Sequence, residues 1–97
     1  MAVMVLLEIQ AKEGTGDELL ATFTETLPDT RSRDGFLDLV VHQNQEDKDD
    51  IVFVEKWETK DAHLSYIAWR QETGGFDDLA AALSTPPRLR YYDITDV

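Results

Sequence analysis

The fold is decided by the stretch IVFVEKWET at residues 51–59. Its first four residues are all apolar, a pattern typical of a strand whose two faces are both buried. Thr59 then supplies a side-chain oxygen of the kind that caps helix starts. The stretch therefore predicts a strand over residues 51–58 that leads directly into a helix.

The predicted helix after residue 59 has an aromatic stripe. Residues three and four apart share one face of a helix. This face and its border contain Ala62, Tyr66 and Trp69, with His63, Ile67 and Arg70 beside them. The pair Gly74-Gly75 is expected to end the helix, because glycine readily adopts the left-handed backbone that terminates helices. A short helical piece over residues 76–83 and a tyrosine-rich strand over residues 88–95 are predicted to follow.

Upstream of the deciding stretch, the sequence predicts a strand and a helix. Residues 3–11 place apolar side chains on both faces of a strand. Thr15 and Glu18 have the spacing of a capping box at a helix start. Pro28 is expected to end or kink this helix, because proline lacks the backbone donor. The apolar stripe of the helix contains Leu19, Leu20, Phe23 and Leu27.

A turn at Gly35 precedes the second strand, which is predicted over residues 36–43. A polar loop at residues 44–50 then joins this strand to the deciding stretch as a hairpin. We expect His42 to pair across the sheet from the face that it shares with Phe36, Asp38 and Val40.

The element order βαββαβ predicts an α+β, ferredoxin-like fold with an antiparallel sheet, in a single domain over residues 1–97. Two helices cover only one face of a four-stranded sheet, yet at least two strands are apolar on both faces. A second subunit is the economical cover for the other face, since twofold homodimers are the commonest oligomers. The sequence therefore predicts a homodimer.

Composition restricts the partners and the compartment. Twenty acidic and nine basic residues give a formal net charge of -11, which disfavours nucleic acid and anionic membrane surfaces as partners. The chain contains no cysteine. It therefore has no disulfide and no thiolate chemistry, which suits a cytoplasmic protein.

No cofactor is predicted. The acidic loop at residues 46–50 resembles a calcium loop only in its charge, because Ile51 and Val52 stand where such a loop requires an oxygen ligand and a glycine. The two histidines are far apart in the sequence, and no Gly-rich phosphate or dinucleotide fingerprint occurs. We therefore expect no metal, flavin or nicotinamide.

Several parts of the chain together resemble one family. The stretch VEKWET at residues 54–59, followed by a helix with His63 and Tyr66, is similar to the strand-to-second-helix signature of the antibiotic biosynthesis monooxygenases. The resemblance extends over essentially the whole chain, through the apolar first strand, the helix opening at residues 14–17, the Gly35 turn and the aromatic last strand. It implies a dimeric α/β barrel in which each subunit keeps a pocket between sheet and helices.

The resemblance implies two kinds of activity. Some members of that family oxidise phenols or anthrones to quinones with oxygen, without metal or flavin, and others bind and degrade haem. The first kind relies on an asparagine, a tryptophan and a tyrosine around the substrate, and the second on a first-strand asparagine, a tryptophan and an axial histidine. Here the only asparagine is Asn44, in the hairpin loop, and the first strand offers Glu8 and Gln10 instead.

From this resemblance we expect a cofactor-independent monooxygenase acting on an electron-rich aromatic molecule of the phenol, anthrone or quinol type. The alternative is a non-catalytic dimer that binds a small hydrophobic metabolite. A further alternative is a haem-binding or haem-degrading protein, in which His63 supplies the axial nitrogen.

Five residues are predicted to form the site. His63 is the candidate base, because imidazole exchanges protons near neutral pH. Tyr66, one helical turn along, is the candidate donor to a developing oxyanion. Trp57 and Trp69 are candidate pocket walls, and Arg70 is a candidate partner for a substrate carboxylate. Each also has a structural interpretation, with Trp57 as a core residue, His63 and Tyr66 as packing residues and Arg70 at the solvated helix end.

Overall fold

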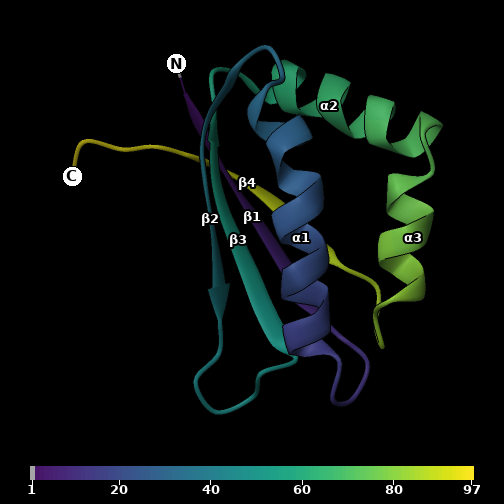
Figure 1. The fold of residues 1–97 in the computed structure, drawn as a ribbon. Coiled ribbons are helices and arrows are strands. Elements are labelled where there is room, and N and C mark those ends of the chain that lie inside the picture. The colour runs from purple at the N-terminus through teal and green to yellow at the C-terminus, as the bar shows by residue number, and fades with distance from the viewer. Residues whose placement is uncertain (1) are drawn as a thin grey trace.

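The computed structural model describes residues 2–97, so Met1 of the predicted domain lies outside the described residues. The elements run in the order β1 (Val3–Gln10), α1 (Gly16–Arg31), β2 (Phe36–Gln43), β3 (Asp50–Trp57), α2 (Lys60–Glu72), α3 (Gly75–Ala81) and β4 (Arg88–Asp93) (Figure 1). The α+β, ferredoxin-like βαββαβ fold is confirmed, and α3 is the short helix predicted before the last strand. Within residues 2–97, no helix has the length and apolar character needed to span a membrane.

The strands form one antiparallel sheet in the order β2-β3-β1-β4. Val5 of β1 lies opposite Glu55 of β3 on one side and opposite Tyr91 of β4 on the other. Residues that lie opposite one another project from the same face of a sheet. Glu55, Val5 and Tyr91 therefore share a face, which is the face that the helices cover.

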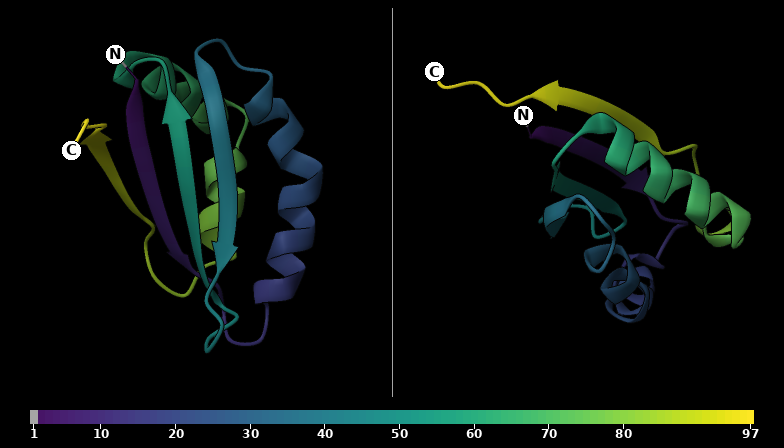
Figure 2. Two further views of the ribbon diagram at one scale, coloured as in Figure 1. Left: turned by 90° about the vertical axis from the view of Figure 1, so that its left-hand side faces the viewer. Right: turned by 90° about the horizontal axis from the view of Figure 1, so that it is seen from above.

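All three helices pack on this one face of the sheet (Figure 2). The hydrophobic core lies between the face and the helices, and the rings of Phe23 in α1 and Phe53 in β3 meet edge to face with centroids 4.8 Å apart. The buried residues of this core are Ile9, Ala11, Leu19, Phe23, Leu39, Ile51, Phe53 and Leu83.

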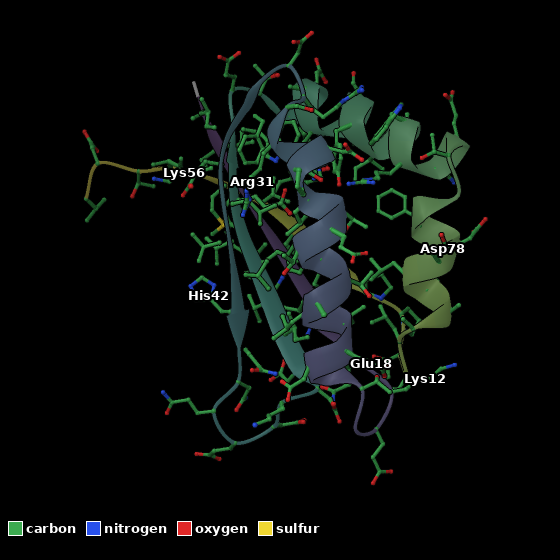
Figure 3. All side chains as sticks on the ribbon, viewed as in Figure 1. Lys12, Glu18, Arg31, His42, Lys56 and Asp78 are labelled. Atoms are coloured by element: carbon green, nitrogen blue, oxygen red, sulfur yellow. The ribbon has the colours of Figure 1, made fainter. Side chains whose placement is uncertain are left out.

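The opposite face of the sheet is uncovered in the single chain and is apolar at its centre. Leu6 of β1 and Val54 of β3 are opposite one another there and only half-buried, and Val40 of β2 is 46% exposed. His42 and Lys56 project from the same side, away from the helices (Figure 3). The central strands are thus apolar on both faces, as the sequence predicts.

A β-bulge between Phe36 and Asp38 changes the face of one residue. Phe36 lies opposite Trp57 on the helix side, whereas Asp38 lies opposite Lys56 on the uncovered side. The extra residue of a bulge resets the alternation of the strand. The expectation that Phe36 shares a face with His42 was therefore wrong.

The start of α1 is held by Asp49 of the β2–β3 loop. The Asp49 carboxylate accepts hydrogen bonds from the backbone N–H groups of Gly14 and Gly16, at 2.9 and 2.8 Å. The Thr15 hydroxyl instead donates to a backbone carbonyl of the preceding turn. The predicted capping box of Thr15 and Glu18 was therefore wrong, because the hairpin brings a carboxylate to the same backbone donors.

Helix α1 continues past Pro28 to Arg31, so of the two expected effects of Pro28, an end of the helix was wrong, and a kink stays a prediction. The last turn is anchored from α2, where Arg70 donates to the carbonyl oxygen of Thr26 at 2.8 Å and to Thr30 Oγ1 at 2.9 Å. These tertiary hydrogen bonds hold the helix on both sides of Pro28, where its missing backbone donor weakens the helix.

Helix α2 begins and ends as predicted. The Thr59 hydroxyl accepts a hydrogen bond from the backbone N–H of Ala62 at 3.0 Å. Gly74 follows the helix in the left-handed conformation, with a φ of 80°. This cap fixes the first turn of α2, from which His63 projects toward the sheet.

Loss of the Asp49 cap is expected to destabilise the fold. We expect Asp49→Ala to lower the free energy of unfolding by about 1–2 kcal/mol, because two backbone donors at the start of α1 lose their acceptor. Urea unfolding followed by circular dichroism measures the change. Glu46→Ala, which alters an exposed carboxylate of the same loop, is the matched control. Equal stability of the two variants would contradict the role given to Asp49.

Candidate functional site

A cavity of about 780 Å³ lies between the sheet and the helices. All four strands and all three helices contribute to its lining, which is mainly apolar. Its polar side chains include Glu55, His63, Tyr66 and Arg70, together with Asp29, Asp78 and three threonines. A cavity of this size and character is typical of sites for small organic molecules.

Glu55 places a carboxyl group on the covered face of β3, with only 3% of the residue exposed. Its neighbours across the sheet, Val5 and Leu39, are apolar and buried. Burial raises the pKa of Glu55 to about 7, because the charged form loses its hydration. The indole N–H of Trp57 donates to Glu55 Oε1 at 2.9 Å and lowers this pKa by less than burial raises it. Both protonation states of Glu55 are therefore populated near neutral pH.

His63 is 1% exposed and lies between Glu55 and Tyr91. Its Nδ1 is hydrogen-bonded to the Tyr91 hydroxyl at 2.7 Å, and its Nε2 lies 3.9 Å from Glu55 Oε1. Burial lowers the pKa of His63 to about 4, so the imidazole is neutral at neutral pH and forms no ion pair with Glu55. The pKa of Tyr91 is raised by burial and by the negative charge of Glu55. Tyr91 therefore stays a protonated phenol.

Two atoms of the Glu55–His63 pair face accessible space. Among residues 2–97, neither Glu55 Oε2 nor His63 Nε2 has a hydrogen-bond partner. In this part of the chain, the only fully enclosed side-chain nitrogen or oxygen without a partner is Arg90 Nε. Oε2 and Nε2 are therefore not sealed inside the protein. Because both side chains line the cavity, a ligand there can reach both atoms.

Tyr66 provides a second polar position in the cavity. Its hydroxyl accepts a hydrogen bond from Arg70 Nε at 2.9 Å and lies 2.7 Å from Thr30 Oγ1. When Thr30 is the donor of that second bond, the Tyr66 hydrogen remains free for an oxygen atom of a ligand. The positive charge of Arg70 strengthens the Tyr66 hydroxyl as a donor.

The two tryptophans have different positions. Trp69 lines the cavity, and two guanidinium groups lie within 5.0 Å of its ring centroid. Trp57 is fully buried against the rings of His63 and Tyr66, at 5.2 and 5.3 Å, and is not among the lining residues. Trp57 therefore acts on the cavity indirectly, through its hydrogen bond to Glu55.

Four of the five predicted site residues line this one cavity, namely His63, Tyr66, Trp69 and Arg70. Their functional roles stay predictions. The sequence analysis did not identify Glu55 or Tyr91 as site residues. Glu55 alternates with Phe53 and Trp57 on the inward face of the deciding stretch, and this period of two is the signal that places a carboxyl group inside.

The acidic hairpin loop satisfies its polar groups internally. The Asn44 side chain accepts from the backbone of Glu46 and donates to Asp50, and Asp47 accepts from the backbone of Asp49. Within residues 2–97, no three or more His, Cys, Asp or Glu side chains are grouped to hold a metal ion. The expected independence from metal and flavin stays a prediction.

Comparison with known proteins gives one family and many similar folds. The family model for antibiotic biosynthesis monooxygenases matches residues 2–73. A conserved protein from Methanosarcina mazei Go1 has a TM-score of 0.85 at 19% identity, with 98% of this chain and 94% of that chain covered. A search of curated protein sequences finds no match.

Two of the similar structures are enzymes. A variant of SnoaB, a cofactor-independent oxygenase from Streptomyces nogalater, has a TM-score of 0.84 at 14% identity, with 99% of this chain and 95% of that chain covered. A monooxygenase from Streptomyces coelicolor in complex with nanaomycin D has a TM-score of 0.82 at 16% identity, with coverages of 99% and 89%. At these identities the likeness establishes the fold alone.

Glu55 and His63 are expected to affect stability in opposite directions as pH changes. The pKa of Glu55 is raised from 4.5 to about 7, so its stabilising contribution is complete below pH 4.5 and is lost as pH rises through 7. The pKa of His63 is lowered from 6.5 to about 4, so its contribution is complete above pH 6.5 and is lost as pH falls through 4. The two effects partly cancel between pH 4.5 and 6.5.

Single variants should separate these effects. We expect the stability of Glu55→Gln to rise with pH between 4 and 6.5, and that of His63→Gln to fall with pH between 4.5 and 7, each by up to roughly 1.4 kcal/mol per pH unit. Urea unfolding at a series of pH values measures both slopes. Glu58→Gln, at an exposed carboxyl, is the control. If the unfolding free energy of both variants changes with pH as it does in the parent protein, the shifted pKa values assigned to Glu55 and His63 are contradicted.

Proposed function

Because the chain belongs to the antibiotic biosynthesis monooxygenase family, we propose that it is a cofactor-independent monooxygenase for an electron-rich aromatic molecule of the phenol, anthrone or quinol type. Family membership by itself supports a monooxygenase or a binder of small molecules. The step to an oxygenase rests on one observation, the convergence of Glu55, His63 and Tyr66 on a mainly apolar cavity.

The proposed chemistry begins with loss of a proton from the substrate. Oxygen in its ground state is a triplet, so its direct reaction with a closed-shell aromatic is spin-forbidden. A phenolate or carbanion, however, can pass one electron to oxygen, after which the two radicals combine to a hydroperoxide. For an anthrone, loss of water from the hydroperoxide gives the ketone, so that one CH₂ group and O₂ become C=O and H₂O.

The cavity offers a group for each requirement of this reaction. The proton leaves at the Glu55–His63 end, where His63 is the base predicted from sequence. The Tyr66 hydroxyl, polarised by Arg70, donates to the oxygen on which negative charge develops. Trp69 and the apolar lining exclude water from the anion, which strengthens these electrostatic interactions. Arg70 acts through Tyr66 in this scheme rather than on a substrate carboxylate.

We also propose that the chain functions as a homodimer with the uncovered sheet faces packed together. Burial of the half-exposed apolar side chains of that face contributes roughly 25 cal/mol per Å². Glu8 on this face pairs with Arg88 at 3.6 Å and with Arg90.

Two cavity variants test the mechanism once a substrate has been identified by a screen of phenols, anthrones and quinols for thermal stabilisation. We expect His63→Gln and Tyr66→Phe each to slow turnover by about a hundredfold or more, because each removes a group that acts in the transition state. Oxygen uptake measures the rate, and the melting temperature reports on folding. Glu58→Gln, which alters an exposed carboxyl outside the cavity lining, is the control. Parental rates in both cavity variants would show that these residues only pack.

No oxygen uptake with any ligand that stabilises the protein would favour the alternative function, a non-catalytic binder of a hydrophobic metabolite. This outcome separates the two functions, because a binder gives thermal stabilisation without consumption of oxygen.

Neighbouring leucines of β1 test the dimer. Leu6 lies on the uncovered face, whereas Leu7 lines the cavity on the covered face. We expect Leu6→Asp to convert the dimer to a folded monomer, and Leu7→Asp to lower the melting temperature through the subunit core. Sedimentation velocity at micromolar concentration measures the mass of each variant. A parent protein that sediments only as a monomer would refute the proposed dimer.

A further inference from the structure

We propose that Glu55 is the catalytic base of the reaction and that its Oε2 atom takes the proton directly from the bound substrate. This inference rests on the proposed oxygenase function and names the proton acceptor within it. The sequence alone suggests His63 for that role.

The position of Oε2 is the first argument for Glu55. Glu55 is one of the residues that line the cavity, and its Oε1 is held by the Trp57 indole N–H at 2.9 Å. This hydrogen bond fixes the orientation of the carboxyl plane and leaves Oε2 as the free acceptor. Oε2 has no partner among residues 2–97 and is not sealed inside the protein. A substrate in the cavity therefore meets an oriented, unoccupied carboxylate oxygen.

The surroundings of Glu55 are the second argument. Its neighbours in β1 and β2, Val5 and Leu39, carry no charge. From α2 it faces neutral His63, whose Nδ1 is engaged by Tyr91 of β4. No cation among residues 2–97 forms an ion pair with the carboxylate. A carboxylate without a compensating cation is a stronger base than one in an ion pair.

Among residues 2–97, Arg70 is the only lysine or arginine that lines the cavity, and it is occupied elsewhere. Arg70 donates to Tyr66, Thr30 and the carbonyl oxygen of Thr26. Lys60 lies 4.7 Å from the centroid of the Tyr91 ring rather than beside Glu55. No ion pair joins Arg70 to Glu55 within residues 2–97, which suits removal of a proton by the carboxylate and stabilisation of an oxyanion by Tyr66 and Arg70.

The pKa values of the two candidate bases, Glu55 and His63, also favour Glu55. The pKa of Glu55 is raised to about 7, which is near the value at which a base is both available and strong at neutral pH. The pKa of His63 is lowered to about 4, so the imidazole holds a substrate proton poorly. His63 serves as a neutral positioning residue, held by Tyr91, that contacts the substrate or Glu55 through Nε2.

The proton and electrons balance without a further reagent. The C–H or O–H bond of the substrate breaks, its electron pair stays on the aromatic system and the proton goes to Oε2. Oxygen then takes electrons from the substrate anion and forms the hydroperoxide after return of the proton from Glu55. Return of this proton restores the carboxylate for the next turnover, and loss of water from the hydroperoxide, which takes one further hydrogen from the same carbon, completes the reaction.

The test uses 1,8-dihydroxyanthrone, whose enolate absorbs visible light, with the full chain under anaerobic conditions. We expect the parent to form the enolate at a rate that rises with pH to a plateau, with a midpoint near 7. Glu55→Gln should slow this step by about a hundredfold or more and abolish the midpoint, because the amide accepts no proton. Glu55→Asp keeps a carboxylate and should recover part of the rate. Admission of oxygen to each sample then measures quinone formation and oxygen uptake.

The variants and controls keep the test decisive. Glu55→Gln preserves shape and an acceptor for the Trp57 N–H, and quenching of tryptophan fluorescence verifies that it binds the anthrone. Glu58→Gln, at an exposed carboxyl, should behave as the parent.

His63→Gln should keep a midpoint near neutral pH even where its rate is reduced, because Glu55 still titrates. Infrared spectra of the protein without ligand should contain a carboxylic acid band that disappears near pH 7 and is missing from Glu55→Gln.

The outcomes separate this inference from the proposed function. Parental enolate formation by Glu55→Gln, or loss of the midpoint only in His63→Gln, would overturn the role of Glu55 while leaving the oxygenase intact. An enolate that forms through Glu55 but gives no quinone and no oxygen uptake would overturn the oxygenase and leave the base assigned. Absence of the enolate from the parent would overturn both.

Discussion

Burial of the Glu55 carboxyl group is the constraint on which the cavity depends. The pleat of β3 turns this side chain inward between Val5 and Leu39, where water cannot hydrate a charge. An ion pair would stabilise the carboxylate, but the nearest partners are the Trp57 N–H and a neutral His63. The group therefore stays in balance between its two protonation states at neutral pH, instead of remaining a fixed charge.

The surrounding structure keeps Glu55 between its two protonation states, because the neighbouring polar groups form hydrogen bonds with other partners. Arg70 connects α2 to the last turn of α1 through Thr26 and Thr30, so its charge is directed to Tyr66. Tyr91 of β4 holds the imidazole of His63 by its Nδ1. The same contacts that attach the helices to the sheet thus direct Arg70 to Tyr66 and Tyr91 to His63, and leave Glu55 without a cationic partner among residues 2–97. Stability and the proposed chemistry share these hydrogen bonds.

Much of the fold was predictable, because it follows from patterns that are local in sequence. The unbroken apolar run at residues 51–54 and the Thr59 cap identified β3 and α2, and the apolar residues of β1 indicated that both faces of the sheet are apolar there. One error, the face of Phe36, comes from the local β-bulge in β2, and the other two have one cause. Asp49 replaces the Thr15 cap, and α2 supports the turn after Pro28, through contacts between residues far apart in the chain.

The candidate site divides in the same way. The sequence by itself determined which side chains α2 presents together, because helical spacing places His63, Tyr66 and Arg70 on neighbouring turns. Only the tertiary structure decided their protonation and partners. Burial makes His63 neutral and keeps Glu55 close to half-protonated, and strand pairing brings Tyr91 to the imidazole. A pKa depends on how much water and charge surround a group in space, and these surroundings exist only after distant segments have packed together.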